Sequence, residues 1–298
     1  MNKEPLISVI IPAYNHPSDL QRAIGSVLRQ TWQNFEVLVA DDGSEEDIKS
    51  VCDSFNDKRI KYLRNKEHKN ANAARNRGIT EAKGEYIAML DADDEFLPDH
   101  LLHRVNRIRE WGCDGIFGSA YIYDGEKEKI KRSRSLKKNE NMADYLLTDG
   151  FCPTPSHFYK AGAVKKILWD EELYWNQDYD FSIRFAEKFD FRCDPEPTVR
   201  VHWHKGHKRK LNDIHFDSQK KFTAKHNSRI SLPALVNYFY SMKREAKEIG
   251  SEKQFDFYQA ELNRIAPYYK WYLILIEAKM TVVVNRIINY NFENKIKR

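Results

Sequence analysis

An acidic cluster directly follows an apolar run in residues 84–95, GEYIAMLDADDE. Residues 86–90 are typical of a buried strand, and the acids after it are Asp91, Asp93, Asp94 and Glu95. In open α/β sheets ligands bind at the carboxyl ends of the strands, so we expect a site here. Crowded carboxylates repel one another, and a hard divalent cation shared with substrate phosphates would offset the repulsion. The alternative is a solvated turn that caps the next helix, because aspartate is a favoured N-cap residue.

Composition limits the class of protein. The 298 residues allow one substantial α/β domain with an appendage, or two domains. A hydrophobic fraction of 41% and a charged fraction of 31% are ordinary for a soluble protein with a sizeable core. The net charge of +5 permits an anionic substrate or a membrane surface without requiring nucleic acid, and we expect no nucleic-acid partner.

Cysteine spacing and the N-terminus indicate the compartment. The four cysteines lie far apart, which argues against a disulfide scaffold and a paired metal motif: Cys52, Cys113, Cys152 and Cys193. Buried thiols in a reducing compartment are the simplest account of them. The apolar run 6–11 is too short for a signal peptide. We therefore expect a cytoplasmic protein.

Strand and helix patterns alternate along the first third of the chain. The expected strands are 6–11, 36–40, 59–64 and 85–90, the first of them ended by Pro12. Helical spacing of apolar residues lies between them, including 71–82, so we expect βαβ units and a mostly parallel sheet. The second strand also ends in acids, Asp41 and Asp42. Neither GxGxxG nor GxxxxGK[ST] occurs, which argues against a dinucleotide oxidoreductase and a P-loop enzyme.

The pattern continues less regularly after the acidic cluster. Pro98 opens a helix that Gly112 closes, and a single strand is expected at 115–123. The basic run 127–138, KEKIKRSRSLKK, predicts a solvated loop; contact with an anionic acceptor or a membrane surface is the alternative. A helix at 161–167, a helix whose first turn carries Asp178 and Asp180, and strands at 190–194 and 197–203 follow. Beyond about residue 215 the pattern is helical.

Five motifs in this order resemble the family 2 glycosyltransferases, which have a GT-A fold. They are ISVIIPAYN, EVLVADDGS, ARNRG, GEYIAMLDADD and QDYD, and the resemblance covers residues 5–204. The implied fold class is α/β, a Rossmann-like, mostly parallel sheet flanked by helices, with a C-terminal helical extension. The implied domains are a catalytic domain over 1–215 and a helical region over 216–298. Within the first, 1–125 would bind the nucleotide-sugar, and 126–215 would hold the acceptor and the base.

The resemblance also implies roles for individual residues. The nucleotide, most often UDP in this family, would lie against donor-binding residues, namely Pro12, Ala13, Tyr14, Asn15, Asp41, Asp42, Arg75, Asp91, Ala92 and Asp93. Tyr14 would lie beside the base, and Asp42 or its neighbour Asp41 would accept the N–H of the base. In the D-x-D pair, Asp93 would bind Mn²⁺ or Mg²⁺, and Asp91 would contact ribose or metal-bound water. His202 would lie near the diphosphate and the metal, with His204 as an adjacent rival.

Catalysis would depend on a carboxylate that follows the family's Glu-Asp pattern. Here Gln177 replaces the first member, and Asp178 is retained as the expected general base. A base removes the proton of the attacking hydroxyl, and a cation stabilises the diphosphate leaving group. A single base with direct attack gives inversion, whereas retention would need a second displacement. Trp169, Trp175 and Trp203 pack in a core or stack on acceptor sugars.

We therefore expect a metal-dependent, inverting glycosyltransferase of the hexosyltransferase type. Its donor would be a nucleotide-sugar, its acceptor a saccharide or lipid-linked saccharide, and its setting bacterial surface polysaccharide or glycolipid assembly. The alternatives are a nucleotidyltransferase of related α/β fold and an inactive sugar- or lipid-binding protein. The tail 268–292 carries dispersed charges that suit neither a membrane span nor an interfacial helix. We expect it to pack on the catalytic domain or in a homodimer interface, with peripheral membrane attachment as the alternative.

Overall fold

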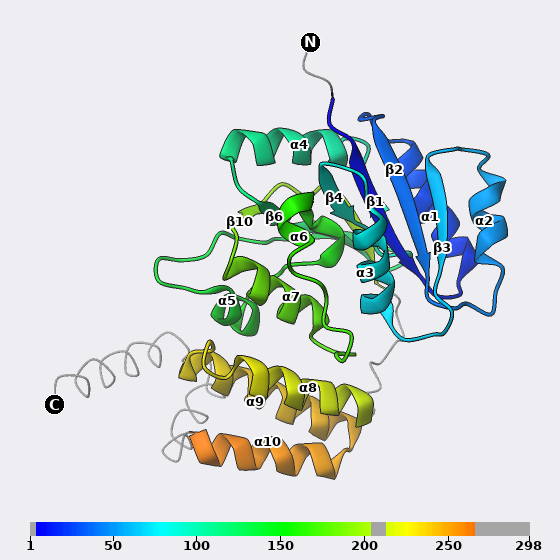
Figure 1. Ribbon diagram of the computed structural model, residues 1–298. Helices are drawn as coiled ribbons and strands as arrows, with labels where there is room; N and C mark the ends of the chain where they lie inside the picture. The colour runs from blue at the N-terminus through cyan, green and yellow to red at the C-terminus, as the bar shows by residue number, and fades with distance from the viewer. Residues whose placement is uncertain (1–3, 204–212, 266–298) are drawn as a thin grey trace. The chain divides into compact units, whose positions relative to one another are not determined.

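The computed structural model describes residues 4–203 and 213–265 of the chain. They form two compact units that divide after Arg229 (Figure 1). The first unit is an α/β fold, and the second is helical. The expected tail segment 268–292 and His204 lie outside the described residues.

A sheet of seven strands forms the centre of the first unit, in the order β10-β6-β9-β4-β1-β2-β3. Its strands are β1 (Ile7–Ala13), β2 (Phe35–Asp41), β3 (Ile60–Arg64), β4 (Tyr86–Met89), β6 (Gly115–Gly118), β9 (Phe158–Lys160) and β10 (Phe191–Asp194). Neighbouring strands are parallel except at β9, which runs antiparallel to both β4 and β6. The expected α/β class with a mostly parallel central sheet is confirmed.

Strand β1 shows why the strands of this sheet appear in the sequence as continuous apolar runs. All of its residues are buried. Ile7, Val9 and Ile11 join the core that contains the buried face of helix α1 (Pro17–Leu28). Ile10 faces the opposite way, where a Cβ added at Gly78 of helix α3 (Ala71–Glu81) would come within 2.5 Å of its side chain. Helices therefore cover both faces, as in a parallel sheet, and glycine in ARNRG lets α3 approach closely.

Eight helices accompany the sheet among the described residues of the first unit. They are α1 (Pro17–Leu28), α2 (Ile48–Ser54), α3 (Ala71–Glu81), α4 (His100–Trp111), α5 (Met142–Thr148), α6 (Ala161–Val164), α7 (Gln177–Ala186) and α8 (Asp213–His226), with a 3₁₀ turn at Thr154–Ser156. Gly112 ends α4 in the left-handed conformation with φ of 66°, as its position in the sequence predicts. Helix α6 ends at Val164, earlier than the expected 167.

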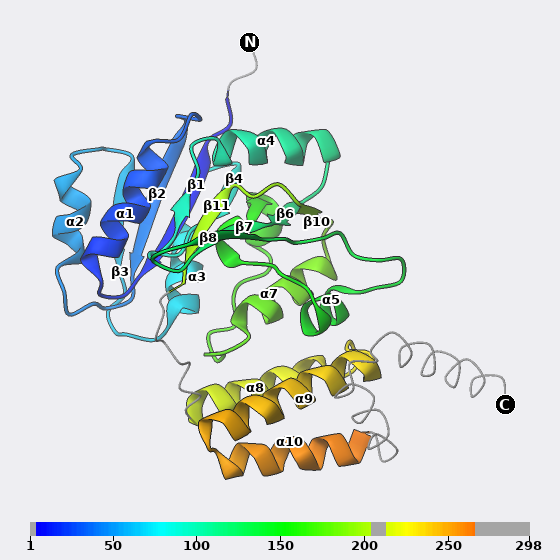
Figure 2. The ribbon, with the colours of Figure 1, turned by 180° about the vertical axis from the view of Figure 1, so that it is seen from behind.

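A second, four-stranded sheet lies beside the first, in the order β5-β11-β7-β8 (Figure 2). Its strands are β5 (Glu95–Phe96), β7 (Ala120–Tyr123), β8 (Glu128–Lys131) and β11 (Val199–His202). The expectation of one strand over 115–123 is wrong, because the chain changes sheets at Ser119. Gly118 allows this change, since a Cβ there would lie 2.4 Å from the Asp194 carbonyl oxygen.

Two other expectations are corrected. Pro12 does not end the first strand, which continues to Ala13. The pairing of β1 with β4 stops at Ile10, and past that point β1 pairs with β2 alone, so a residue without an N–H can be accommodated. The basic run 127–138 is not entirely loop, because β8 occupies part of it.

The second unit contains α9 (Leu232–Ile249) and α10 (Glu252–Ile265), which pack together. Four apolar residues of α9 that share one side of the helix are buried, namely Leu235, Val236, Phe239 and Ala246. Helix α8 belongs to the first unit instead, so this unit extends past residue 215. None of the helices within the described ranges 4–203 and 213–265 combines the length and apolarity needed to cross a membrane.

Candidate functional site

A cleft of about 470 Å³ opens where β1, β2 and β4 end. Its walls come from the loops after these strands, from the loop after β3 and from the N-terminal parts of α1 and α3. The lining residues are Pro12, Ala13, Tyr14, Asn15, His16, Asp19, Asp42, His68, Ala71, Ala74, Arg75, Asp91, Ala92 and Asp93. Every predicted donor-binding residue except Asp41 is among them. Motifs far apart in the sequence thus meet at the carboxyl edge of the sheet.

The loop after β1 is fastened to the loop after β2. Asn15 adopts a left-handed conformation with φ of 56°, which asparagine tolerates better than most residues. Its backbone N–H donates to Ser44 Oγ at 2.8 Å, and its Oδ1 accepts from the Glu45 N–H at 3.0 Å. These bonds fix the Ala-Tyr-Asn corner and direct Tyr14 into the cleft.

Asp42 and Asp41 have different surroundings. Both are buried, but Asp41 accepts hydrogen bonds from the Ser44 N–H, the Tyr62 hydroxyl and Arg64, which are internal to the loop and to β3. Its carboxylate supports the strand ends and does not line the cleft. Of the two aspartates proposed to accept the N–H of a base, only Asp42 faces the cleft.

His68 sits beside Asp42 and covers Tyr14. The two rings stack with centroids 4.0 Å apart, and His68 Nδ1 lies 2.9 Å from Asp42 Oδ2. The Lys69 N–H and Asn65 Nδ2 also donate to this carboxylate. The His68 side chain is half exposed, so it is the partner of Asp42 that a ligand could most easily displace. The sequence motifs gave no signal for His68.

The acidic segment, residues 91–95, presents its first two aspartates to the cleft. Asp91 accepts a hydrogen bond of 2.7 Å from Arg75. The backbone oxygen of Asp93 accepts one of 2.7 Å from Arg22, which also pairs with Asp19. Carboxylates outnumber the cations that line the cleft, with Asp19, Asp42, Asp91 and Asp93 set against Arg75. This imbalance suits a divalent cation with oxygen ligands.

Asp94 and Glu95 point away from the cleft and hold β11. Asp94 accepts from the His202 N–H at 2.9 Å, and burial together with the charges of Asp93 and Asp91 raises its pKa well above the usual value. Glu95 accepts from His202 Nε2 at 2.9 Å and from Arg200 at 3.3 Å. Burial opposes ionisation of Glu95, but these two bonds outweigh it and lower its pKa. His202 is therefore attached to the acidic segment. A metal on its Nε2 would have to replace the bond to Glu95, whereas a metal on its Nδ1 would leave that bond in place.

Asp178 lies in the first turn of α7, outside the group that lines the cleft. Its Oδ1 accepts from the Tyr179 N–H at 3.0 Å. Burial raises the pKa of Asp178 and the charge of Asp91 adds to this, while the Arg75 guanidinium acts in the opposite direction. Arg75 and Asp91 thus act electrostatically on the predicted base, which links it to the cleft. A carboxyl with a raised pKa is better matched to accepting a proton near neutral pH.

Three asparagines of the α3 region clamp the loop that leads to α7. Asn72 Nδ2 donates to the Asp170 carbonyl at 2.7 Å and the Leu173 carbonyl at 3.1 Å. Asn76 exchanges hydrogen bonds with the backbone of Trp169, and Asn70 donates to the Glu171 carbonyl. The three asparagines, Trp169 and Leu173 are buried, so the bonds among them are shielded from water.

Arg75 connects this clamp with the cleft. It donates to Asn72 Oδ1 at 3.2 Å and to Asp91 at 2.7 Å, and its guanidinium lies 4.6 Å from the centre of the Trp169 ring. Trp169 is buried and stacks on Phe181, which assigns it to the core and not to acceptor stacking. Trp175 is half-buried and Trp203 is half exposed, so these two remain candidates for contact with a saccharide.

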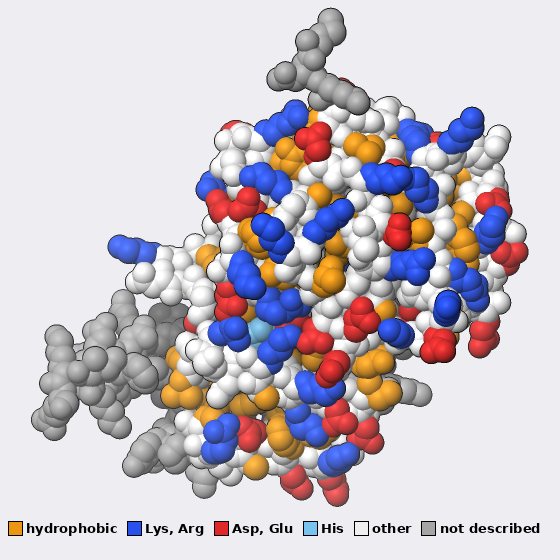
Figure 3. All heavy atoms as spheres, viewed as in Figure 1, with side chains coloured by type: hydrophobic (Ala, Val, Ile, Leu, Met, Phe, Trp, Pro, Cys, Tyr) orange, Lys and Arg blue, Asp and Glu red, His pale blue; other side chains and the backbone are white. Residues whose placement is uncertain are grey.

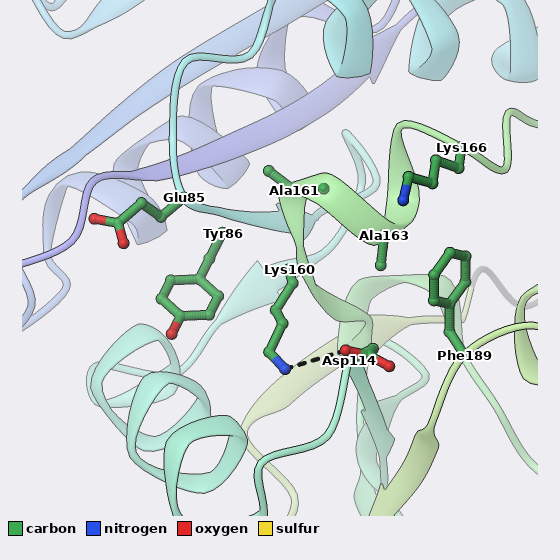
Figure 4. A pocket seen from close by; sticks show the side chains of 9 residues that line it. Glu85, Tyr86, Asp114, Lys160, Ala161, Ala163, Lys166 and Phe189 are labelled. Atoms are coloured by element: carbon green, nitrogen blue, oxygen red, sulfur yellow. Dashed lines mark hydrogen bonds and ion pairs between the residues drawn. The ribbon is translucent and has the colours of Figure 1, made fainter.

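A larger cavity of about 550 Å³ lies at the opposite edge of the sheet, where β4 begins (Figure 4). Tyr86 and Phe189 contribute aromatic faces, and the charge of Lys160 is paired with Asp114 at 3.1 Å. None of the predicted site residues lies there. The smaller cleft, which gathers the predicted carboxylates, is the candidate active site.

The residues present fit a divalent cation without enclosing it. No three His, Cys, Asp or Glu side chains in the described part of the chain form a metal-binding group. Asp93 and Asp91 would supply carboxylate oxygens, and substrate phosphates and water would complete the shell, as Mg²⁺ commonly requires.

Comparison with known proteins gives a family match and several relatives. The model described as Glycosyl transferase family 2 matches residues 8–168. The uncharacterized glycosyltransferase MJ1057 of Methanocaldococcus jannaschii is 32% identical over 61% of this chain and 64% of its own length. The amylovoran biosynthesis glycosyltransferase AmsB of Erwinia amylovora is 30% identical over 73% and 79%. The GalNAc(5)-diNAcBac-PP-undecaprenol beta-1,3-glucosyltransferase of Campylobacter jejuni is 32% identical over 58% and 57%.

Solved structures share the fold at low identity. S. aureus TarS 1-349 in complex with UDP has a TM-score of 0.58 at 16% identity, over 89% of this chain and 91% of that one. The mannosyltransferase PcManGT of Pyrobaculum calidifontis in complex with GDP-Man and Mn2+ has a TM-score of 0.54 at 16% identity, over 95% and 76%.

Proposed function

Because the chain belongs to glycosyltransferase family 2, we propose that it transfers a sugar from a nucleotide-sugar to an acceptor hydroxyl with inversion at the anomeric carbon. The observation that carries the proposal is the cleft itself. It gathers Tyr14, Asp42, Arg75, Asp91 and Asp93 from four separate motifs at one edge of the sheet. A packing role would not require these polar groups to converge there.

In this proposal UDP is the nucleotide. Tyr14 packs against the base, and Asp42 accepts its N–H in place of His68. The UDP complex of TarS supports this choice, and the GDP-Man complex of PcManGT makes GDP the competing nucleotide. The acceptor is a saccharide or a lipid-linked saccharide, as the name of the Campylobacter relative suggests. The AmsB relative points to bacterial polysaccharide assembly.

Asp178 acts as the general base. It takes the proton from the acceptor hydroxyl as that oxygen attacks the anomeric carbon, while the bond from that carbon to the diphosphate oxygen breaks. The clamp around Asn72 positions the loop before Asp178, and Gln177 offers an uncharged hydrogen-bonding group beside it. Asp93, assisted by Asp91, would hold Mn²⁺ or Mg²⁺, which supplies Lewis-acid stabilisation of the diphosphate when bound.

The first prediction tests the metal and the donor together. Asp93→Ala should abolish metal-dependent donor binding, because it removes the main carboxylate ligand. Calorimetric titration of UDP, GDP and their sugar conjugates, with and without Mn²⁺, measures this directly. Asp99→Ala is a suitable control, since this aspartate follows the same segment, makes no side-chain cap bond to α4 and is absent from the cleft.

Measuring the released product under the same conditions distinguishes the alternative functions. Release of UDP from a UDP-sugar supports sugar transfer, whereas release of pyrophosphate would indicate a nucleotidyltransferase. Binding without turnover for every donor and acceptor would indicate an inactive binding protein. Undiminished, Mn²⁺-stimulated binding to Asp93→Ala would show that this carboxylate is not the metal ligand.

A further inference from the structure

An exposed basic surface lies on the second sheet, away from the residues that line the cleft. Strand β8 is an edge strand, and residues 125–132 around it are all exposed. The segment that follows β8 projects from the α/β unit in both views (Figures 1 and 2). We define the basic edge as five exposed cations of these two segments, namely Lys127, Lys129, Arg132, Lys137 and Lys138.

The cations of the basic edge are not directly paired with acids in the part of the chain that the structure describes. In the described ranges, none of its five side chains forms a hydrogen bond or ion pair with an acid. Three of the acids nearby have other partners. Glu128 pairs with Arg200 at 2.6 Å, Glu140 pairs with Arg134, and Asp124 accepts the backbone N–H groups of Glu126 and Lys127. On the face of the first unit that Figure 3 shows, basic and acidic side chains are interspersed. The basic edge is therefore a local excess of positive charge.

Protection of the sheet edge against pairing with another strand explains only some of the cations of the basic edge. Lysines on an edge strand prevent strand-to-strand aggregation, which suits Lys129. Arg132, Lys137 and Lys138 lie beyond the end of β8, where there is no edge to protect. Ile130 is 41% exposed in the middle of the strand, which edge protection would not favour. An apolar side chain surrounded by cations is instead suited to an anionic interface.

We propose that the basic edge binds an anionic phospholipid surface. Clusters of four to eight Lys or Arg residues are typical of segments that bind anionic lipid headgroups. Ile130 favours a lipid surface over a soluble polyanion, because only the lipid offers an apolar layer. The surface is joined to the acidic segment, since Arg200 bridges Glu128 of β8 and Glu95 of β5. Membrane contact would thus hold the enzyme where a lipid-linked acceptor is presented, although the binding does not depend on sugar transfer.

Vesicle co-sedimentation of the full chain tests the proposal. The test variant is K129Q/R132Q/K137Q/K138Q, and the matched control is K58Q/R77Q/K83Q/K188Q, which removes the same charge from exposed positions elsewhere. Wild type and the control should bind vesicles that contain phosphatidylglycerol and not pure phosphatidylcholine vesicles. The test variant should bind at least about thirtyfold more weakly, as the loss of two contacting cations at about 1 kcal/mol each would produce. Rising salt should weaken the wild-type binding.

Three results would overturn the proposal: equal vesicle binding by both variants, no vesicle binding by wild type, or retention on heparin without vesicle binding. Donor hydrolysis in solution is measured on the same samples and should be unchanged in both variants. If donor hydrolysis is absent but vesicle binding follows the basic edge, the proposed sugar transfer fails and this inference stands.

Discussion

At the residue scale, the proposed chemical step depends on Asp178 as the general base. We predict that Asp178→Asn lowers kcat by roughly 10²- to 10⁴-fold, the usual contribution of a positioned base. The donor KM should remain close to that of wild type, because Asp178 lies outside the group that lines the cleft. Steady-state assays of UDP release measure both constants. Asp144→Asn, on helix α5, is the control.

The pH profile gives a second test of the same residue. The base must be ionised, and burial raises its pKa above the ordinary value of 3.8, so kcat/KM should rise with pH through an acid limb displaced upward. The charge of Arg75 opposes that displacement. Arg75→Gln should therefore move the limb to still higher pH, in addition to lowering the rate. A limb that stays in place in this variant would rule out Asp178 as the group that titrates.

Much of this site was predictable because it lies at the ends of strands. The position of Asp42 or Asp93 follows from a buried strand and the residue that comes after it, which are local properties. The partners of these residues are not local. His68 reaches Asp42 from a loop 26 positions along the chain, and no motif marks it. The preference for Asp42 over Asp41 also required the structure, since only the hydrogen bonds of Asp41 show that it is already used.

At the scale of elements, side-chain hydrogen bonds from three asparagines join α3 to the loop before α7. The clamp joins residues separated by 93 to 101 positions, so sequence periodicity could not reveal it. The sequence predicted α3 correctly, but its asparagines read only as polar positions. The break at Ser119 was missed for the same reason, because β6 and β7 are distinguished by their partners in two sheets and not by their composition.

We predict that Asn72→Ala weakens the attachment of the loop before α7 to α3. It leaves the partly buried Asp170 carbonyl, the buried Leu173 carbonyl and one Arg75 N–H without this partner, at a cost of about 2–3 kcal/mol in the free energy of unfolding. Because the loop leads into Asp178, kcat should fall more than the donor KM rises. Urea unfolding and UDP-release kinetics measure the two effects.

Asn141→Ala provides a comparison with the same change of side chain. Asn141 caps α5 and donates to the Arg229 carbonyl, far in sequence from the clamp. It should lower stability and leave kcat unchanged. If Asn72→Ala also kept the wild-type kcat, the clamp would be structural only.

At the scale of the molecule, the first unit extends through α8 because a buried ion cluster joins this helix to α7. Asp180 is fully buried and accepts from His226 Nε2 at 2.8 Å, with Arg184 at 2.6 Å and Lys225 at 2.8 Å. The sequence placed Asp180 beside Asp178 but gave no reason to connect it with a helix about forty residues later. The boundary of the unit therefore depends on a pairing that only the fold brings together.

This cluster makes stability dependent on pH. Burial works against ionisation of Asp180, but the bonds from His226, Arg184 and Lys225 outweigh it and hold its pKa below the ordinary 3.8. A carboxyl with a lowered folded-state pKa stabilises the protein above its unfolded value, and this stabilisation is lost as pH falls. Asp180→Asn should lower the free energy of unfolding at neutral pH by roughly 3 kcal/mol, as for a broken buried pair. As the pH falls below about 5, the free energy of unfolding of this variant should decrease less steeply than that of wild type. Urea titrations across this pH range test both effects. The control is Asp217→Asn, at an exposed position, which should follow wild type. If the free energy of unfolding of Asp180→Asn fell with pH in parallel with that of wild type, the assignment would be contradicted.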